Sequence, residues 1–398
     1  MQRAQLWQAW TRSSPLPLRH LIAAALVAIL VAAVYGPLAT GLFARSNDFR
    51  SHLTVALHLY ETARPIAPHF LYHGITALVY AVLPGPSIFV AGAAVIVAAY
   101  GLTGGVTYGV YWRALRRLRL AAPWVIAVTS VATLMAQPIT TVQSYSIGYL
   151  WPDPYHSPTF TMLKPFALAA FAGTAWCLTH REVARAGLVV LFALVTLAGA
   201  LTKPSFVICV LPATALMMAW RLWQRLPLSW WALIGGLFTP AGAVLAWQFL
   251  AAFSGAGGDE MYQDSVSWAP LKFMHHWATG LPAKFVASTL FPLTVVALYW
   301  STVRRDTLLQ FAWLCFGFGA LYSYAVVETD HWAAGNFVWS GYITLFTLFV
   351  ATTIFWLRQA ALSEGRWLTR ALVCGAVFAL HVLSGMRLAW LHLKEYAL

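Results

Sequence analysis

The chain has 398 residues, of which 60% are hydrophobic and only 9% are charged. Soluble domains carry about 25% charged residues, so this composition excludes a soluble enzyme, a disordered protein and a fibrous protein. It predicts an all-α polytopic membrane protein whose residues 1–398 form a single transmembrane domain. The net charge of +13 does not indicate a nucleic-acid partner, because the basic residues lie in small clusters between apolar runs.

Apolar runs along the chain predict about eleven transmembrane helices. The first run, from Leu21 to Pro37, could be a secretory signal, but we interpret it as a retained helix because further spans follow. The runs at 187–201 and 205–220 are short and could instead form a re-entrant pair. The expected spans are 21–38, 87–111, 122–138, 163–179, 187–201, 205–220, 230–252, 286–302, 308–327, 337–357 and 371–386.

The basic clusters predict the orientation of the chain in the membrane. All of them can be placed in the cytoplasm if the N-terminus is also cytoplasmic, which leaves the C-terminus outside. The outer loops are then 39–86, 139–162, 253–285 and 328–336. The clusters are Arg113, Arg116, Arg117 and Arg119; Arg181 and Arg185; Arg221 and Arg225; Arg304 and Arg305; and Arg358, Arg366 and Arg370.

Most carboxylates and histidines fall in these outer loops. The positive-inside rule does not require this, since acidic residues contribute little to it. We therefore expect any chemistry to take place on the non-cytoplasmic face. The cysteines lie singly inside apolar runs and are expected to be small core residues: Cys177, Cys209, Cys315 and Cys374.

The first outer loop predicts a helix that begins near a carboxylate. Asn47 or Asp48 can cap this helix, because the apolar residues that follow have helical spacing. Asp48 is either that cap or a carboxylate that abstracts a proton or binds a metal, with Arg50 and His52 next to it in the sequence.

The run Phe70–Leu83 is too short to cross a membrane and ends in a Pro-Gly-Pro turn. It predicts an interfacial or re-entrant helix. His69 and His73 are four residues apart, so we expect them on one face of this helix, where such a pair can bind a metal.

The second outer loop contains Trp151, Asp153, Tyr155 and His156 between prolines that enforce an ordered, non-helical path. Its aromatic rings could stack on a sugar or lie in the aromatic belt of the membrane.

Two lysines lie beside the apolar runs. Lys164 is at the start of one span, and Lys203 precedes Pro204 between two short runs. A lysine at this depth needs a partner. It either extends to the interface or binds a phosphate from the lipid side.

The remaining outer segments carry further polar groups. The glycine-rich stretch 255–258 could be a lid or a solvated loop. Glu328, His331 and Asn336 lie close together in the sequence, against the ends of two spans. Such a density of polar groups beside hydrocarbon predicts either a functional site or a helix-capping turn.

The chain resembles the GT-C class of integral-membrane glycosyltransferases. The resemblance lies in the many spans, the cytoplasmic N-terminus, the acidic residue of Ser46-Asn47-Asp48-Phe49 soon after the first span, and the amphipathic helices of the first outer loop. It covers nearly the whole chain. It implies a polyprenyl-phosphate-linked sugar as donor, a glycan or lipid acceptor, and transfer on the non-cytoplasmic face. The composition, rich in Arg, Ala and Trp, suits a bacterial plasma (inner) membrane.

The resemblance also implies roles for individual residues in an inverting displacement at the sugar C1. Asp48 is the expected general base, and Glu328 and Asp153 are expected to stabilise the oxocarbenium-like centre. The residues expected to bind the donor phosphate are Arg50, Lys164 and Lys203. The residues expected to position substrate are His52, His73, Trp151, Tyr155, His156, His331 and Asn336.

Two other functions stay open on the sequence. A polymerase or ligase of lipid-linked polysaccharides would depend on outer arginines, here Arg45, Arg50, Arg64 and Arg387. A lipid or solute transporter would need a polar path through the spans, and the chain has no internal repeat of the kind many transporters show. We assign no cofactor and no metal ligands, and leave a divalent metal as an open alternative.

Overall fold

A computed structural model describes residues 17–45, 47–65, 67–83, 85, 87–118, 121–139, 157–180, 185–253, 265–277, 279–362 and 366–396. Within these ranges, eight helices are long and apolar enough to cross a membrane. The chain therefore has the fold of an all-α, multi-pass membrane protein. The eight segments are Leu18–Gly41, Ile88–Leu115, Pro158–Thr179, Trp230–Ala251, Leu281–Val303, Thr307–Ala325, Trp332–Ala361 and Leu368–Lys394.

Each apolar run expected to span the membrane contains a helix. Three of these helices, α6, α8 and α9, are shorter than the eight, with 13, 17 and 17 residues. The elements are α2 (Leu18–Arg45), α3 (Asn47–Thr62), α4 (Leu71–Val82), α5 (Ile88–Leu115), α6 (Pro123–Met135), α7 (Pro158–Thr179), α8 (Ala186–Thr202), α9 (Val207–Trp223), α10 (Trp230–Leu233), the π-helix η2 (Ile234–Phe238), α11 (Thr239–Phe253), β1 (Val266–Trp268), α12 (Lys272–Trp277), α13 (Leu281–Val303), α14 (Thr307–Ala325), β2 (Val326–Glu328), the 3₁₀ turn η4 (Trp332–Ala334), α15 (Val338–Ala361) and α16 (Arg366–Tyr396).

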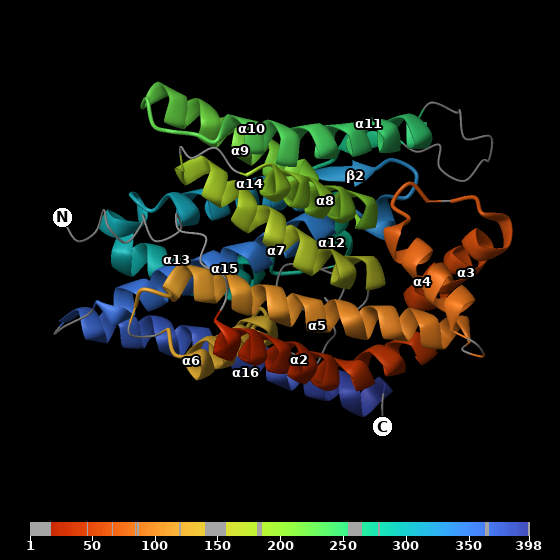
Figure 1. The fold of residues 1–398 in the computed structure, drawn as a ribbon, viewed down its shortest axis with the longest axis horizontal. Helices are drawn as coiled ribbons and strands as arrows, with labels where there is room; N and C mark the ends of the chain where they lie inside the picture. The colour runs from red at the N-terminus through yellow and green to blue at the C-terminus, as the bar shows by residue number, and fades with distance from the viewer. Residues whose placement is uncertain are drawn as a thin grey trace.

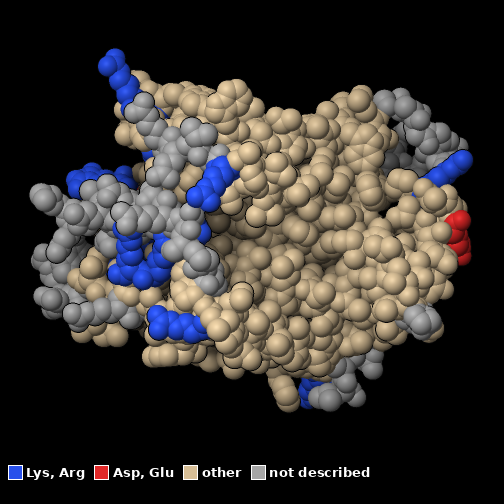
Figure 2. All heavy atoms as spheres, viewed as in Figure 1, with Lys and Arg blue, Asp and Glu red and all other residues tan. Residues whose placement is uncertain are grey.

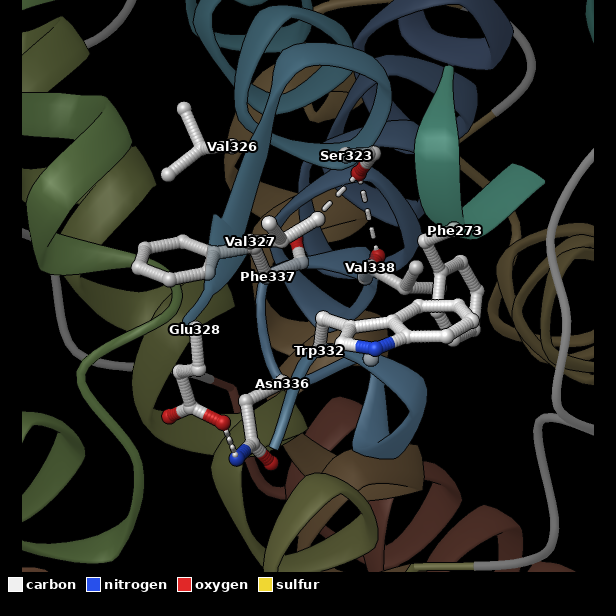
Figure 3. A pocket seen from close by; sticks show the side chains of 10 residues that line it. Phe273, Ser323, Val326, Val327, Glu328, Trp332, Asn336, Phe337 and Val338 are labelled. Atoms are coloured by element: carbon white, nitrogen blue, oxygen red, sulfur yellow. Dashed lines mark hydrogen bonds between the residues drawn. The ribbon is translucent and has the colours of Figure 1, made fainter. Parts of the chain in front are cut away.

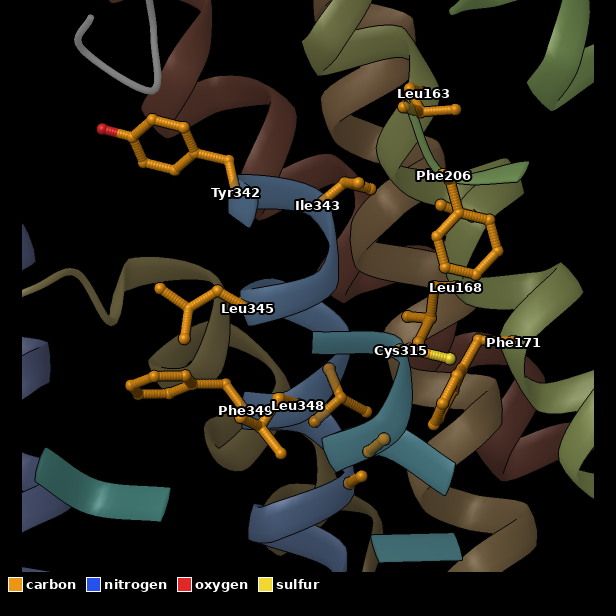
Figure 4. Packing of buried hydrophobic residues seen from close by; sticks show 14 of the residues in the cluster. Leu163, Leu168, Phe171, Phe206, Cys315, Tyr342, Ile343, Leu345, Leu348 and Phe349 are labelled. Atoms are coloured by element: carbon orange, nitrogen blue, oxygen red, sulfur yellow. The ribbon is translucent and has the colours of Figure 1, made fainter. Parts of the chain in front are cut away.

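The long helices run side by side along the longest axis of the molecule, while α3, α4 and β2 lie toward one end of it (Figure 1). Helix α15 is central: it packs against α5, α7, α13, α14 and α16, and nearly all of its residues are buried. Its buried side chains pack against those of α7 and α14 in the core (Figure 4).

Close helix contacts depend on small residues, as expected where lipid is as apolar as the helix surface. A Cβ at Gly319 of α14 would collide with Thr344 and the backbone of Ser340 on α15. A Cβ at Gly236 would likewise collide with Phe192 of α8. That second glycine lies in η2, and its carbonyl accepts a hydrogen bond of 2.7 Å from Thr196.

Helix α6 ends at Met135, three residues before the predicted end of its span, because the next residues are held extended between α13 and α16. The imidazole of His381 lies 2.8 Å (Nδ1) from the carbonyl oxygen of Gln137 and 3.3 Å (Nε2) from the backbone nitrogen of Phe291. The hydroxyl of Ser384 donates to the carbonyl of Pro138 at 2.8 Å. These bonds satisfy backbone groups that a broken helix leaves without partners.

Most of the basic residues lie at one end of the long axis. In Figure 2 most lysine and arginine side chains lie at one end of the molecule, and an acidic group is visible at the other. We call the first the basic end. It holds the turns between α5 and α6, α9 and α10, and α13 and α14, together with the end of α15 and the start of α16 (Figure 1). Its described arginines are Arg113, Arg116, Arg117, Arg185, Arg221, Arg225, Arg304, Arg305, Arg358 and Arg370.

A buried ion pair joins three helices at the basic end. Asp306 caps α14, its carboxylate accepting a hydrogen bond of 2.9 Å from the backbone of Leu309. Its other oxygen lies 4.0 Å from the guanidinium of Arg358 on α15, which also donates to the carbonyl of Ala114 at 3.3 Å. Both side chains are about nine-tenths buried, with 10% and 11% exposed.

Removing one partner of this pair should be worse than removing both. Arg358→Met leaves the Asp306 carboxylate buried without its cation and should cost about 3–5 kcal/mol of stability. Arg358→Met combined with Asp306→Ser removes both charges and keeps an N-cap, so it should recover most of that loss. Unfolding in mixed detergent micelles measures both variants. Equal stability of the single and double variants would contradict the interpretation.

Candidate functional site

The site is at the end of the molecule opposite the basic end, and its first component is α3. Asp48 lies in the first turn of this helix, where a carboxylate is favoured by the helix dipole. Because α3 begins at Asn47, Asp48 is inside the helix rather than ahead of it. Its side chain is 30% exposed, and its Oδ1 lies 3.8 Å from Nε2 of His52, one turn later.

Helix α4 packs against α3 and adds a second imidazole. Nε2 of His73 lies 2.8 Å from Nδ1 of His52, and the two rings stack with centroids 5.1 Å apart. The His73 side chain is buried. Burial and the nearby charge of Lys203 lower the pKa of His73 to about 4, so His73 is neutral at pH 7.

The prediction that His69 and His73 share a helix face is wrong. The helix begins only at Leu71, and His69 precedes it in a loop. This loop is fixed by Gln248 of α11, whose amide donates to the carbonyl of Pro68 at 3.1 Å and to that of Ala200 at 3.0 Å. Burial lowers the pKa of His69 to about 3, and the charge of Lys203 adds to this effect.

Lys203 lies between α8 and α9. Helix α8 ends there because Pro204 disfavours helical backbone in the residue before it, and Lys203 is extended (φ −167°, ψ 128°). Its side chain is only 7% exposed, and its Nζ lies 5.5 Å from the ring centre of Trp339. Among the described residues its ammonium makes no ion pair within 4.0 Å.

Two carboxylates act on this ammonium from different elements. Burial lowers the pKa of Lys203 to about 8, while Asp48 and Glu328 both act to raise it. The three groups are therefore close enough to interact electrostatically although they come from α3, the α8–α9 turn and β2. The structure thus brings together two predicted carboxylates and one predicted phosphate-binding residue.

Glu328 is held by a small antiparallel sheet. It is the last residue of β2 and pairs with Val266 of β1. One of its carboxylate oxygens accepts a hydrogen bond of 2.6 Å from the side-chain amide of Asn336 (Figure 3). The turn between them contains Gly335 at φ +64°, a backbone conformation that favours glycine, and a Cβ there would also collide with Phe273. A shallow pocket at this point is lined by Glu328, Trp332 and Asn336.

Lys164 lies near the same aromatic side chains as Lys203. Its Nζ is 4.9 Å from the ring centre of Phe160 and 6.0 Å from that of Tyr100. The rings of Phe160 and Trp339 are in turn 4.9 Å apart, and Trp339 is the ring beneath Lys203. Aromatic faces stabilise cations in such positions.

Other predicted site residues are outside this group or cannot be placed. Arg50 is exposed and donates to the carbonyl of Ala44 at 2.6 Å. His331 is exposed in the turn before η4. The second-loop residues and the glycine-rich stretch lie outside the described residues: Trp151, Asp153, Tyr155, His156 and 255–258.

Sequence reasoning missed Trp339 and Gln248. The sequence gives no reason to choose Trp339 among the many tryptophans of the chain. Its contacts with Phe160 and Lys203 in the structure distinguish it. A glutamine inside an apolar run was a usable signal, since such a group needs partners in a membrane. In the described part of the chain, no group of three or more His, Cys, Asp or Glu residues is arranged to hold a metal ion.

The arrangement can hold an anion beside a buried ammonium and can accept a proton on a carboxylate within electrostatic range of it. No protein family, no curated protein and no solved structure matches this chain. The geometry of this site is therefore the main guide to function.

The lowered pKa of Lys203 predicts how anion binding depends on pH. A bound anion favours the charged ammonium and raises its pKa above 8. At a pH above 8 the lysine of the free protein is mostly neutral, so it must take up a proton when the anion binds. Affinity for polyprenyl phosphate should therefore be constant near pH 7 and fall about tenfold per pH unit above 8. Native mass spectrometry or microscale thermophoresis in nanodiscs measures it.

Lys203→Arg is the matched control for this experiment. A guanidinium stays charged across the range, so its affinity should change little between pH 8 and about 9.5. If the affinities of the native protein and of Lys203→Arg fall in parallel, Lys203 is not the anion-binding group.

Proposed function

We propose that the protein is a membrane glycosyltransferase that moves a sugar from a polyprenyl-phosphate donor to an acceptor hydroxyl with inversion at C1. The observation that carries the proposal is the buried Lys203 ammonium, which two carboxylates of separate elements influence at the end opposite the arginines. A phosphate would give this cation a counter-ion. A carboxylate beside the phosphate would then be next to the sugar attached to it.

The proposal includes a topology of the GT-C type. With a cytoplasmic N-terminus, the arginines of the basic end are cytoplasmic, as the positive-inside rule requires. The site then faces the periplasm or cell exterior of a bacterial plasma membrane, and α6, α8 and α9 cross together with the longer helices, giving about eleven crossings. The position of most basic residues at one end of the long axis supports this orientation (Figure 2).

In the proposed reaction, the acceptor oxygen attacks C1 of the sugar while Asp48 takes the hydroxyl proton. The bond between C1 and the phosphate oxygen breaks, and the electron pair leaves on polyprenyl phosphate. The ammonium of Lys203 offsets the charge that grows on this oxygen, as fixed cations do in other phosphate chemistry. The products are the glycosylated acceptor and polyprenyl phosphate, and Asp48 is left protonated.

Neighbouring groups would hold the reactants. Glu328, oriented by Asn336, is placed to stabilise positive charge on the sugar ring. Lys164 adds a second cation beside the aromatic pair that borders Lys203. We retain Asp153, Trp151, Tyr155, His156, His331 and Arg50 as proposed substrate contacts.

Asp48→Asn should abolish transfer while leaving expression and folding intact. The amide keeps the shape of the carboxylate but cannot accept the proton, and general-base catalysis is worth about 10²–10⁴-fold in rate. The assay follows release of polyprenyl phosphate by mass spectrometry. It uses a panel of synthetic polyprenyl-phosphate hexoses and pentoses as donors, and lipid extract of the producing cells as acceptor.

Glu61→Gln provides the matched control. Glu61 is exposed near the other end of α3, so its loss changes the charge of the same helix without touching the site. It should leave the rate unchanged. Full activity of Asp48→Asn, or an equal loss in both variants, would remove Asp48 from the role of base.

A further inference from the structure

The His52 imidazole has a different neighbour at each nitrogen. Its Nδ1 is 2.8 Å from Nε2 of His73, which is hydrogen-bonding distance. Its Nε2 lies 3.8 Å from Oδ1 of Asp48, which is within ion-pair range. Both ring nitrogens of His52 thus have a protein side chain as neighbour, whereas the sequence predicted that His52 positions substrate.

The direction of the His52–His73 hydrogen bond follows from the surroundings of His73. Nδ1 of His73 is buried and has no hydrogen-bond partner among the described residues. If that nitrogen carried the proton, a buried N–H would be left unsatisfied, at a cost of about 1–3 kcal/mol. The proton is better placed on Nε2 of His73, which then donates to Nδ1 of His52.

The tautomer of His52 is fixed as a consequence. Its Nδ1 is the acceptor, so its own proton is on Nε2, directed toward the Asp48 carboxylate. The opposite tautomer would set a nitrogen lone pair against a carboxylate oxygen. Both ends of the ring therefore favour the same arrangement.

We propose that His73 is a positioning residue that fixes His52 as the Nε2–H tautomer, so that His52 orients Asp48 and Asp48 alone accepts the acceptor's proton. The role of Asp48 in this statement rests on the proposed function. The tautomer and its dependence on His73 do not.

The charged and titratable groups around the two imidazoles determine the protonation states in which His73 donates to His52. Burial and the charge of Lys203 oppose protonation of His73 and lower its pKa to about 4, and His73 in turn contributes to the lowered pKa of His69. Asp48 faces His52, and the Tyr72 ring lies edge-on to it at 6.0 Å. Protonating His52 would make its Nδ1 a donor and force the proton of His73 onto the buried Nδ1.

Three variants separate these effects. His73→Leu removes the donor and keeps an apolar side chain of similar size. His73→Gln keeps an N–H donor at the distance of the imidazole Nε2. His52→Gln identifies the His52 signals by their absence. The first measurement is ¹⁵N NMR of histidine-labelled protein in nanodiscs, which reports the tautomer of each imidazole without any substrate.

We expect a single Nε2–H tautomer for His52 in the native protein and in His73→Gln, and a mixture of tautomers in His73→Leu. In transfer assays, His73→Leu should lower kcat about tenfold or more with little change in KM, since a general base that is out of position lowers the rate of the chemical step. His73→Gln should restore the rate.

The two kinds of measurement separate this inference from the proposed function. An Nδ1–H tautomer for His52 in the native protein, or an unchanged tautomer in His73→Leu, overturns the inference even if the protein transfers sugars. The expected tautomers in a protein that transfers no sugar support the fixed His52 orientation and reject the proposed function. Loss of kcat that His73→Gln does not restore would assign His73 a packing role and overturn the inference.

Discussion

The arrangement of the outer end depends on the buried charge of Lys203. An ammonium removed from water is costly unless opposite charges or a ligand offset it. In the described part of the chain, this one lies 5.5 Å from the ring centre of Trp339 and makes no ion pair within 4.0 Å. Asp48 and Glu328 offset part of the cost from a distance. The lowered pKa shows that they do not offset all of it, which leaves a site suited to an anion.

The surrounding elements keep these charged groups in place. Pro204 ends α8 at the lysine, and Gln248 fixes the loop before α4. The β1–β2 pair and the glycine turn hold Glu328 against Asn336. At the opposite end, the Asp306–Arg358 pair is closed and buried, so each of these two charges already has its counter-ion. The two ends use the same kinds of residue for different purposes.

Much of this could be predicted from the sequence, and the rest depends on contacts between distant segments. Apolar runs locate every long helix, because lipid requires continuous hydrogen-bonded backbone. The helix at Asp48 and the short helix after it also follow from local patterns. Pro138 is a local signal that α6 ends early, since proline disfavours helical backbone in the residue before it. The sequence could not show the bonds to His381 and Ser384, more than two hundred residues away, that hold the residues after Met135. Nor could it show that His73 pairs with His52 rather than His69, because the start of α4 depends on the tethered loop before it.

The most direct test of the account is a cryo-EM structure of the protein in lipid nanodiscs with added polyprenyl phosphate. The account predicts phosphate density within hydrogen-bonding distance of Lys203 Nζ, beside Asp48 and Glu328, with the lipid chain leading away between helices. Phosphate bound only among the arginines of the basic end, or an empty outer end with a polar path across the bundle, would contradict it.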